Sequence, residues 1–351
     1  MKTVACVETI STLPLVIDDL PGEAVPYALA AGEGRRTILG GMLITEITRP
    51  ADSGGAFAAA WISGPRGSSV PATRAGEHLF VHLLDGVVEV TLDGARHRLT
   101  AGDSLRVRPG SAFGWELLAH TNRFLAYSTR GVRQGLLVAA GTLTSARVHR
   151  SEAEAIPPAV WREACAISGA DLAPVPAGHR APEVVDVTDT AQNGHRAIVR
   201  AADGERWASH AQVNSYLARG RDTDASYFAV HTRGTRSPWI PRHRHHQHTE
   251  NFLCLDGRVR LEANGTQLLL TRGDFLHAPA GTIHSFRFEG ADTQMLGLLT
   301  TDVFEPFFEY MNAPTTERTF DDSGEPWFPA DGFARARAEL DVEVMGPPPQ
   351  S

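Results

Sequence analysis

The chain contains little cysteine: Cys6, Cys165 and Cys254 are the only three in 351 residues. They are widely separated and form no CxxC pair, which argues against a disulfide framework and against a thiolate zinc site. No segment approaches the roughly 20 apolar residues that a membrane-spanning helix needs, and the first residues lack the apolar core of a signal peptide. These absences predict a reduced, cytoplasmic protein without a membrane partner.

Positive charge is also scarce. The formal net charge is -8, and the sequence has neither long Lys/Arg runs nor a helix-turn-helix pattern. Nucleic acid is therefore not an expected partner. Glycine and proline, in contrast, are plentiful at 33 and 22 residues. Both favour turns, so many short strands are expected in place of long helices.

One offset relates the two halves of the chain. Gly86 and Gly257 stand 171 residues apart, and so do Gly102 and Gly273. Nine more residues meet an identical residue at this offset, namely Leu84, Asp85, Val88, Gly94, Leu99, Thr100, Asp103, Leu105 and Gly110. Ordinary residue usage would supply about two identities in such a stretch. The sequence therefore predicts a duplicated domain.

Each copy has the pattern of β-structure. Apolar and polar residues alternate on both sides of Asn264-Gly265, and Asp93-Gly94 takes the same place in the first copy. Both dipeptides are strong hairpin-turn signals, and short strands with frequent turns predict an all-β fold with a sandwich or barrel in each half. We expect an N-terminal arm (1–25), a first barrel (26–140), a linker (141–194), a second barrel (195–312) and a helical extension with a tail (313–351), with short helices at 159–167, 304–312 and 331–340.

Four side chains of the second copy form a candidate metal site. His243 and His245 are two residues apart, so on a strand they point to one face. Glu250 follows after four residues, and His284 lies in the later segment GDFLHAPAGTIHSF. Three imidazoles and one carboxylate suit Fe, Mn, Ni, Co, Cu or Zn better than Ca or Mg, which prefer oxygen alone.

The spacing of these residues resembles the two-part motif of the cupin family. HxH(x)4E(x)6G matches from His243 to Gly257, and G(x)5PxG(x)2H matches from Gly273 to the last histidine. The resemblance implies two tandem cupin barrels, of the double-stranded β-helix or jelly-roll type, and one metal ion held by the four residues. Two positions depart from the pattern: Ser237 replaces the usual glycine and Phe288 the usual asparagine. Neither position is a ligand.

The first copy lacks the ligands. Leu79 stands where Glu250 stands in the second copy, and Phe113 where His284 stands. The other two ligand positions fall on Ala72 and Arg74, or on Thr73 and Ala75 if one loop residue is deleted. The first barrel is therefore expected to be structural, to face the substrate or to form a dimer.

An apolar pocket is expected around the metal site, because strand alternation places aromatic residues on the faces of the ligands. Its expected members are Tyr227, Trp239, Phe252, Cys254, Phe286 and Phe288. Each could instead belong to the barrel core. Such a pocket suits a flat aromatic or polyketide-like substrate.

Among two-barrel cupins, the whole chain resembles the quercetinase group, the flavonol 2,4-dioxygenases. The resemblance covers the length, the duplication, the ligand set and the run at 26–65. It implies an oxidoreductase that cleaves a flavonol-like or other hydroxylated aromatic or polyketide substrate with O2. The metal, iron first among the candidates, would acidify a substrate hydroxyl, and Glu250 would be the catalytic base that accepts its proton. Bacterial members keep metal ligands in both barrels, and fungal members keep them in the first. This chain has them in the second barrel alone, so the resemblance does not identify the substrate.

Two other functions fit the same residues. A metal-dependent cyclase, isomerase or hydroxylase of a biosynthetic pathway would use the same ligands, and a requirement for O2 separates it from a dioxygenase. A pirin-like regulator or another ligand-binding bicupin would bind its ligand without turnover, since a fold does not fix a function. Two-barrel cupins often pair, so the resemblance also makes a homodimer the assembly to test.

Overall fold

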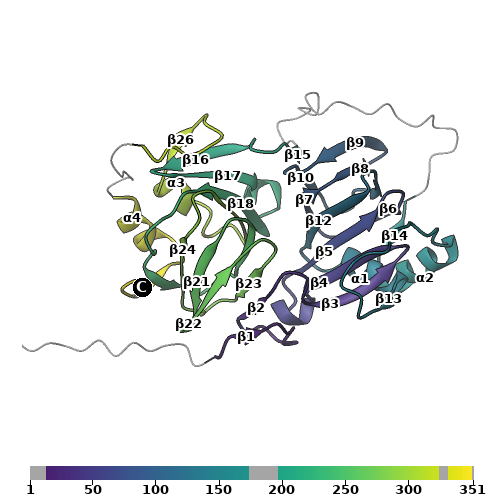
Figure 1. Ribbon diagram of the computed structural model, residues 1–351, viewed down its shortest axis with the longest axis horizontal. Coiled ribbons are helices and arrows are strands. Elements are labelled where there is room, and N and C mark those ends of the chain that lie inside the picture. Colours follow the sequence, from purple (N-terminus) through teal and green to yellow (C-terminus); the bar gives the residue numbers. More distant parts are fainter. Residues whose placement is uncertain (1–12, 174–196, 324–330, 350–351) are drawn as a thin grey trace, which may run out of the picture. The chain divides into compact units, whose positions relative to one another are not determined.

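The protein consists of two β-rich units in the computed structural model, which describes residues 13–173, 197–323 and 331–349 (Figure 1). The N-terminal unit is Gly32–Gly204, and the C-terminal unit combines Met1–Ala31 with Glu205–Ser351. Each unit contains two sheets and a few short helices. The predicted all-β fold with two barrels is confirmed.

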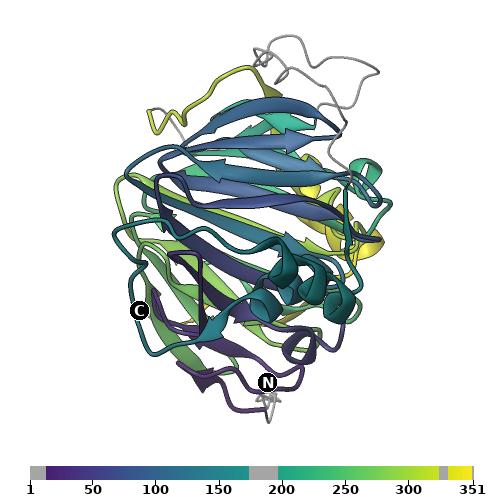
Figure 2. The same ribbon diagram turned by 90° about the vertical axis from the view of Figure 1, so that its right-hand side faces the viewer.

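The N-terminal unit has an eight-stranded sheet with the order β13-β3-β4-β5-β12-β7-β10-β15 and a five-stranded sheet with the order β14-β6-β11-β8-β9. Helices α1 and α2 lie side by side in this unit (Figure 2). Its elements are β3 (Arg35–Leu39), β4 (Met42–Thr48), η1 (Pro50–Ser53), β5 (Ala58–Pro65), β6 (Ser69–Arg74), β7 (Leu79–Asp85), β8 (Val87–Leu92), β9 (Ala95–Thr100), β10 (Ser104–Val107), β11 (Phe113–Leu117), β12 (Thr121–Ser128), α1 (Val132–Ala140), β13 (Thr142–Leu143), α2 (Pro158–Ser168), β14 (Asp171–Leu172) and β15 (Ile198–Val199).

The C-terminal unit has a nine-stranded sheet with the order β1-β2-β23-β20-β25-β18-β17-β16-β26 and a five-stranded sheet with the order β22-β21-β24-β19-β27. Its elements are β1 (Val16–Ile17), β2 (Tyr27–Leu29), β16 (Glu205–Ser209), β17 (Gln212–Ala218), η3 (Gly220–Asp222), β18 (Tyr227–Gly234), β19 (Arg242–Arg244), β20 (Glu250–Asp256), β21 (Val259–Ala263), β22 (Thr266–Leu270), β23 (Phe275–Ala278), β24 (His284–Phe288), β25 (Thr293–Thr300), α3 (Phe307–Tyr310), β26 (Ala313–Thr315), α4 (Gly332–Glu339) and β27 (Glu343–Gly346).

The two hairpin turns form where the sequence predicts them. Asn264 and Gly265 join β21 to β22 with φ of 46° and 84°, and Asp93 and Gly94 join β8 to β9 with φ of 48° and 88°. A two-residue turn with positive φ at both positions matches the twist of the flanking strands, and Asn-Gly and Asp-Gly tolerate that conformation best. The identical turns support the duplication.

Each unit also contains a short strand that the predicted domain boundaries placed in the other barrel. Tyr27 of β2 pairs with His277 of β23 in the C-terminal unit, and Ile198 of β15 pairs with Leu105 of β10 in the N-terminal unit. This grouping differs from the barrel boundaries expected at residues 26 and 195. The physical reason is that a strand joins whichever sheet edge satisfies its backbone groups, and local sequence pattern does not reveal that edge.

Two aspartates of the internal repeat hold these strand-bearing segments. Asp103 and Asp274 each accept a hydrogen bond from the backbone N–H of the threonine three residues earlier. Asp103 also accepts from the N–H of Ala201 at 3.0 Å, and Asp274 accepts from that of Ala31 at 2.7 Å. The repeated Thr-x-x-Asp sequence therefore serves the same purpose in both copies.

The expected linker and tail contain more structure than the sequence indicated. Strands β13 and β14, within 141–194, pair back onto β3 and β6 of the N-terminal unit. The helices expected at 159–167 and 331–340 are present as α2 and α4, and the expected helix at 304–312 is limited to α3. After α4 the chain adds β27, which pairs with β19. Residues 1–12 of the arm and 174–194 of the linker lie outside the described residues.

The interior of each unit lies between its two sheets. In the C-terminal unit, residues of the nine-stranded sheet such as Phe252 and Met295 pack against Leu261 and Phe288 of the five-stranded sheet. Cys254 is buried in the same core, and Cys254 and Cys165 are free thiols; Cys6 lies outside the described residues. No helix in the described part of the chain is long and apolar enough to cross a bilayer.

Candidate metal centre

The four predicted ligands meet inside the C-terminal unit. His243 on β19 lies directly opposite His284 on β24 in the five-stranded sheet. Glu250 begins β20 in the nine-stranded sheet, and His245 follows the end of β19. The four donor atoms all lie within 4.8 Å of one another. Both walls of the barrel thus contribute to one compact cluster of three imidazoles and a carboxylate, which is able to bind a metal ion.

Glu250 is the common neighbour of two of the histidines. Its Oε2 atom lies 2.6 Å from Nε2 of His284 and 3.4 Å from Nε2 of His245. The ring centroids of His243 and His284 are 4.3 Å apart. The carboxylate and the three imidazoles therefore lie close together.

Backbone carbonyl groups orient all three histidines in the same way. Each Nδ1 lies next to a carbonyl oxygen, that of Pro241 for His243 (2.9 Å), that of Thr282 for His284 (3.0 Å) and that of Asp341 for His245. A carbonyl oxygen only accepts hydrogen bonds, so each Nδ1 must carry the proton. In each neutral imidazole, Nε2 then carries the free lone pair. Metal-binding histidines are usually oriented in this way, by a hydrogen bond from the other ring nitrogen.

The protonation of the cluster also suits a cation. Burial, reinforced by the neighbouring imidazoles, lowers the pKa of His243 well below its usual value. Burial alone would raise the pKa of Glu250, but hydrogen bonds from His245 and His284 outweigh it and hold that pKa well below the ordinary range. Burial would likewise lower the pKa of His245, yet Glu250 outweighs it and raises that pKa. A bound cation would take the place of the proton that His245 shares with Glu250.

A residue far along the chain orders the loop between His245 and Glu250. The carboxylate of Asp341 accepts hydrogen bonds from the backbone N–H groups of His246 (2.8 Å) and Gln247 (2.7 Å) and from Nδ1 of His248 (2.9 Å). Together with its carbonyl contact to His245, Asp341 ties the C-terminal segment to the centre. This role of Asp341 could not be predicted from the sequence, because no local pattern links residue 341 to residues 245–248.

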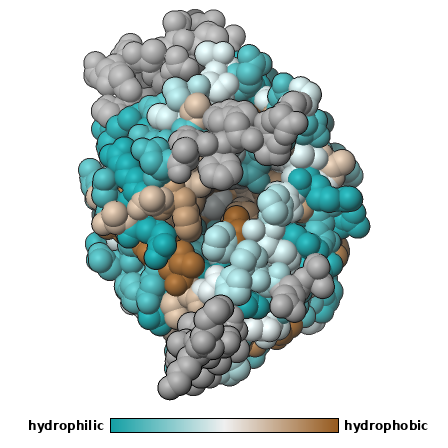
Figure 3. All heavy atoms as spheres, turned by 90° about the vertical axis from the view of Figure 1, so that its left-hand side faces the viewer, coloured by the Kyte–Doolittle hydropathy of each residue, from teal (hydrophilic) through white to brown (hydrophobic). Residues whose placement is uncertain are grey.

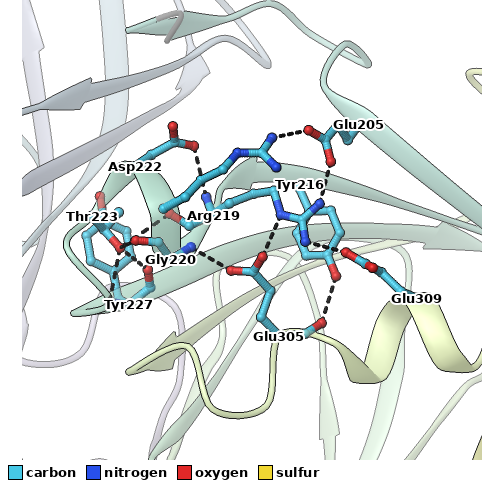
Figure 4. A network of polar contacts seen from close by, with 10 residues as sticks. Glu205, Tyr216, Arg219, Gly220, Asp222, Thr223, Tyr227, Glu305 and Glu309 are labelled. Carbon is cyan, nitrogen blue, oxygen red and sulfur yellow. Dashed lines mark hydrogen bonds and ion pairs between the residues drawn. The ribbon is translucent and has the colours of Figure 1, made fainter. Parts of the chain in front are cut away.

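Phe304 closes the side of the centre next to this loop. Its ring centroid lies 4.6 Å from that of His245 and 5.0 Å from that of His248. The next residue, Glu305, anchors it: its carboxylate accepts from Nε of Arg219 and from the N–H of Gly220, both at 2.5 Å (Figure 4). Phe304 was not predicted as a site residue, although it stands in a segment rich in phenylalanine.

Two of the expected pocket residues lie beside the ligands. The ring of Phe252 is 5.5 Å from that of His284 and 5.8 Å from that of Phe286. Cys254 and Phe288 share these faces, but both are fully buried in the core. The N–H of Ser237 donates to the backbone carbonyl of Phe288, and the N–H of Phe288 donates to Oγ of Ser237. The two departures from the cupin pattern therefore lie side by side, apart from the ligands.

Tyr227 and Trp239 lie on the wrong faces for the expected pocket. Glu250 is in register with Leu299, and Leu299 with Phe228, so residue 227 points to the opposite side of the sheet. Arg287 alternates with the inward-facing residues of β24 and covers the ring of Trp239 at 5.1 Å. The predictions failed because strand parity cannot be assigned without the register.

The described residues of the N-terminal unit form no such centre. Thr73 lies opposite Phe113, as His243 lies opposite His284, so the alignment with one deleted loop residue is the correct one. Within the described ranges, the groups of potential metal ligands are the four-residue cluster and a second group that shares His245 with His248 and Asp341.

The side of the C-terminal unit that carries α3 and α4 is largely hydrophilic. Figure 3 shows a hollow on this side with apolar atoms at its floor.

Comparison with known proteins agrees with this architecture. Residues 233–300 match the model of the cupin domain, and residues 56–124 match that of the EutQ-like cupin domain. An oxalate decarboxylase structure from Bacillus subtilis superposes with a TM-score of 0.52 at 13% identity, over 78% of this chain and 76% of that chain; this likeness concerns the fold alone. The chain therefore contains two cupin domains and has the fold of a bicupin.

Within the bicupins, the chain is similar to the quercetinase group. Quercetin 2,3-dioxygenase of Bacillus subtilis (strain 168) is 28% identical over 339 residues, which span 95% of this chain and 99% of that protein. Quercetin 2,3-dioxygenase of Aspergillus japonicus is 33% identical over 128 residues, which span 32% of this chain and 37% of that protein. The predicted resemblance to quercetinases is confirmed.

Proposed function

We propose that the protein is a metal-dependent dioxygenase that uses O2 to cleave a flavonol-like or other hydroxylated aromatic substrate. The observation that carries the proposal is the cluster of His243, His245, Glu250 and His284, with each Nδ1 held by a carbonyl and Nε2 left for a cation. The similarity to quercetin 2,3-dioxygenases over nearly the whole chain supports it.

A divalent transition-metal ion held by the four ligands would supply Lewis acidity for an acidic substrate hydroxyl. Iron is the first metal to test, followed by Mn, Ni, Co, Cu and Zn, since this donor set tolerates each of them. Phe252 and Phe304 flank the ligand rings. They would hold a flat apolar ring and exclude water from the cluster.

Glu250 is the residue proposed to move the proton. Its low pKa keeps the carboxylate ionised at neutral pH, and Oε2 faces the centre of the cluster. It can accept the proton of the substrate hydroxyl at this atom and so leave an electron-rich anion for reaction with O2. His243, His245 and His284 would hold the cation through Nε2, since the Nδ1 atom of each lies against a backbone carbonyl.

Oxygen uptake by metal-loaded protein with quercetin tests the proposal. Uptake should track the loss of quercetin in the wild type and in His120→Ala, which removes an exposed histidine of the N-terminal unit. It should vanish in His243→Ala. Quercetin left unchanged with every one of the six metals would contradict a flavonol substrate, and turnover without O2 uptake would favour a cyclase or isomerase.

A further inference from the structure

Phe304 reaches the metal centre from the segment 301–305, which follows β25 in the C-terminal unit. Its ring centroid lies 4.6 Å from that of His245 and 5.0 Å from that of His248, on which it stacks. His245 is the ligand that lies outside a strand, because β19 ends at the residue before it. Its imidazole therefore depends on the packing of neighbouring side chains more than the imidazoles of the two histidines on strands do.

Glu305 fixes the end of this segment through both its side chain and its backbone (Figure 4). Its carboxylate accepts from Nε of Arg219 and from the N–H of Gly220, both at 2.5 Å. Its backbone carbonyl accepts from the hydroxyl of Tyr216 at 2.7 Å. Arg219 in turn lies over the ring of Tyr216, with its guanidinium carbon 4.3 Å from the ring centroid. Residues of β17 and of the turn after it thus hold the residue next to Phe304 at three points.

The start of the segment is held as well. Thr301 has φ of 59°, a left-handed conformation that β-branched residues rarely adopt and that the surrounding structure must therefore enforce. Its N–H donates to the carbonyl of Ser226 at 2.8 Å. Asp302 lies so close to η3 that a Cβ on Gly220 would come within 2.3 Å of the Cβ of Asp302, so η3 needs a glycine at this contact. The segment is therefore positioned at both ends, with Phe304 between them.

The counterpart of Arg219 in the N-terminal unit forms a different ion pair. This residue is Arg49, in the alignment with one deleted loop residue, and its Nε and Nη2 atoms each donate at 2.9 Å to the aspartate three residues later. The counterpart of Glu305 is Gln134, whose uncharged amide donates to the carbonyl of Thr48. Among the described residues, the ion pair between this turn and the segment beside the centre thus belongs to the unit that contains the ligand cluster.

We propose that Arg219 and Glu305 are positioning residues of the metal centre. Their ion pair holds Phe304 against the ring of His245 and so sets the direction in which Nε2 of this ligand faces the ion. The phenyl ring also limits the access of water to this side of the ligand, as the apolar surroundings of a metal site do. The inference rests on the metal centre of the proposed function, but it requires neither a flavonol substrate nor O2.

A double-mutant cycle on metal binding tests this coupling. Glu305→Gln keeps the size of the side chain and introduces the amide that the N-terminal unit carries at the same place, so the variant is expected to fold. Phe304→Leu removes the ring and leaves a hydrophobic side chain. The dissociation constant of Co²⁺, from competition with a chromophoric chelator, should rise about fivefold in Glu305→Gln and about tenfold in Phe304→Leu. In the double variant it should equal that of Phe304→Leu alone, because no ring remains for Glu305 to position.

Glu309→Gln is the matched control. Glu309 is a further carboxylate partner of Arg219, but it lies in α3, outside the segment 301–305. This variant should leave the dissociation constant of Co²⁺ and the visible absorption spectrum of the bound ion unchanged, whereas Glu305→Gln should change both. Urea unfolding of the two variants separates a loss of stability from a change at the centre.

Equal effects of Glu305→Gln and Glu309→Gln on the dissociation constant would refute the positioning role and leave a purely structural one. An effect of Glu305→Gln that persists in the Phe304→Leu background would also refute it, since Glu305 would then act by another route. In both cases Co²⁺ binding by the wild type would keep the metal centre of the proposed function. A wild-type protein that binds no Co²⁺ would refute the metal centre and this inference together.

Discussion

Removal of the Asp341 carboxylate should loosen the metal centre although residue 341 is not a ligand. In Asp341→Ala the backbone carbonyl that accepts from His245 remains, but the three hydrogen bonds of the side chain to His246, Gln247 and His248 are lost. His246 and Gln247 are exposed, so water can replace their bonds. His248 is 1% exposed, and its Nδ1–H would be left without a buried acceptor.

The size of the effect follows from that one bond. A hydrogen bond to a charged group contributes about 1.5–3 kcal/mol, which corresponds to roughly 10- to 100-fold in an equilibrium constant. Loss of partners that orient metal ligands changes metal affinity by a similar factor. The predicted metal dissociation constant of Asp341→Ala is therefore about 10- to 100-fold above that of the wild type. Asp341→Asn should show a smaller change, because the amide oxygen still accepts from the loop.

Competition with a chromophoric chelator, followed with Co²⁺ or Ni²⁺, measures this constant. Asp322→Asn is the control, since Asp322 is an exposed aspartate of the same unit. Circular dichroism checks that each variant is folded. If folded Asp341→Ala bound the metal as tightly as Asp322→Asn, the ordering role of the C-terminal segment would be wrong.

Four further predictions concern the same unit. Glu250→Gln should lower metal affinity about tenfold or more and abolish oxygen uptake; unchanged uptake would remove Glu250 from the mechanism. Metal affinity should fall as the pH is lowered from 8 to 5, because Glu250 raises the pKa of His245, whose imidazole therefore takes up a proton in competition with the metal, and a flat profile in chelator titrations would contradict histidine ligation. Arg219→Met should destabilise the unit by about 3 kcal/mol, since Glu205, Glu305 and Glu309 lose their common partner, whereas Arg221→Met, at an exposed pair, should cost less than about 1 kcal/mol in urea unfolding. Leu261→Ala, at a fully buried position, should cost about 2–5 kcal/mol by the same assay; a smaller loss would mean that the core closes around the missing side chain.

The features that could be predicted from the sequence are those that residues close together in the chain determine. The hairpins at Asn264-Gly265 and Asp93-Gly94 depend on two adjacent residues and are present as expected. The cluster of His243, His245, Glu250 and His284 was also found, because the cupin spacing fixes strand, turn and ligand position together. Whether this cluster holds a metal, and which one, stays a prediction for the experiments above.

Features that depend on hydrogen bonding between strands far apart in the chain could not be predicted from the sequence. The faces of Tyr227 and Trp239 are set by the registers of β18 and β24 with their neighbours, and a shift of one residue reverses every side chain. Asp341 and Phe304 reach the centre from segments that carry no cupin motif. Tyr27–Leu29 was assigned to the first barrel because it precedes it in the chain, whereas its hydrogen bonds lie with β23.

That last pairing has a consequence for the order in which the chain is made. Tyr27 meets His277, 250 residues later, so at roughly 5–20 residues per second the ribosome needs about 12–50 s to deliver the partner of a strand that has already emerged. Strand β15, in contrast, finds β10 already synthesised. The N-terminal unit can complete its sheet during translation. The C-terminal unit, which contains the four-residue ligand cluster, needs segments from both ends of the chain. A bulky N-terminal fusion would therefore interfere with the folding of the C-terminal unit, which lies furthest from the fusion in sequence.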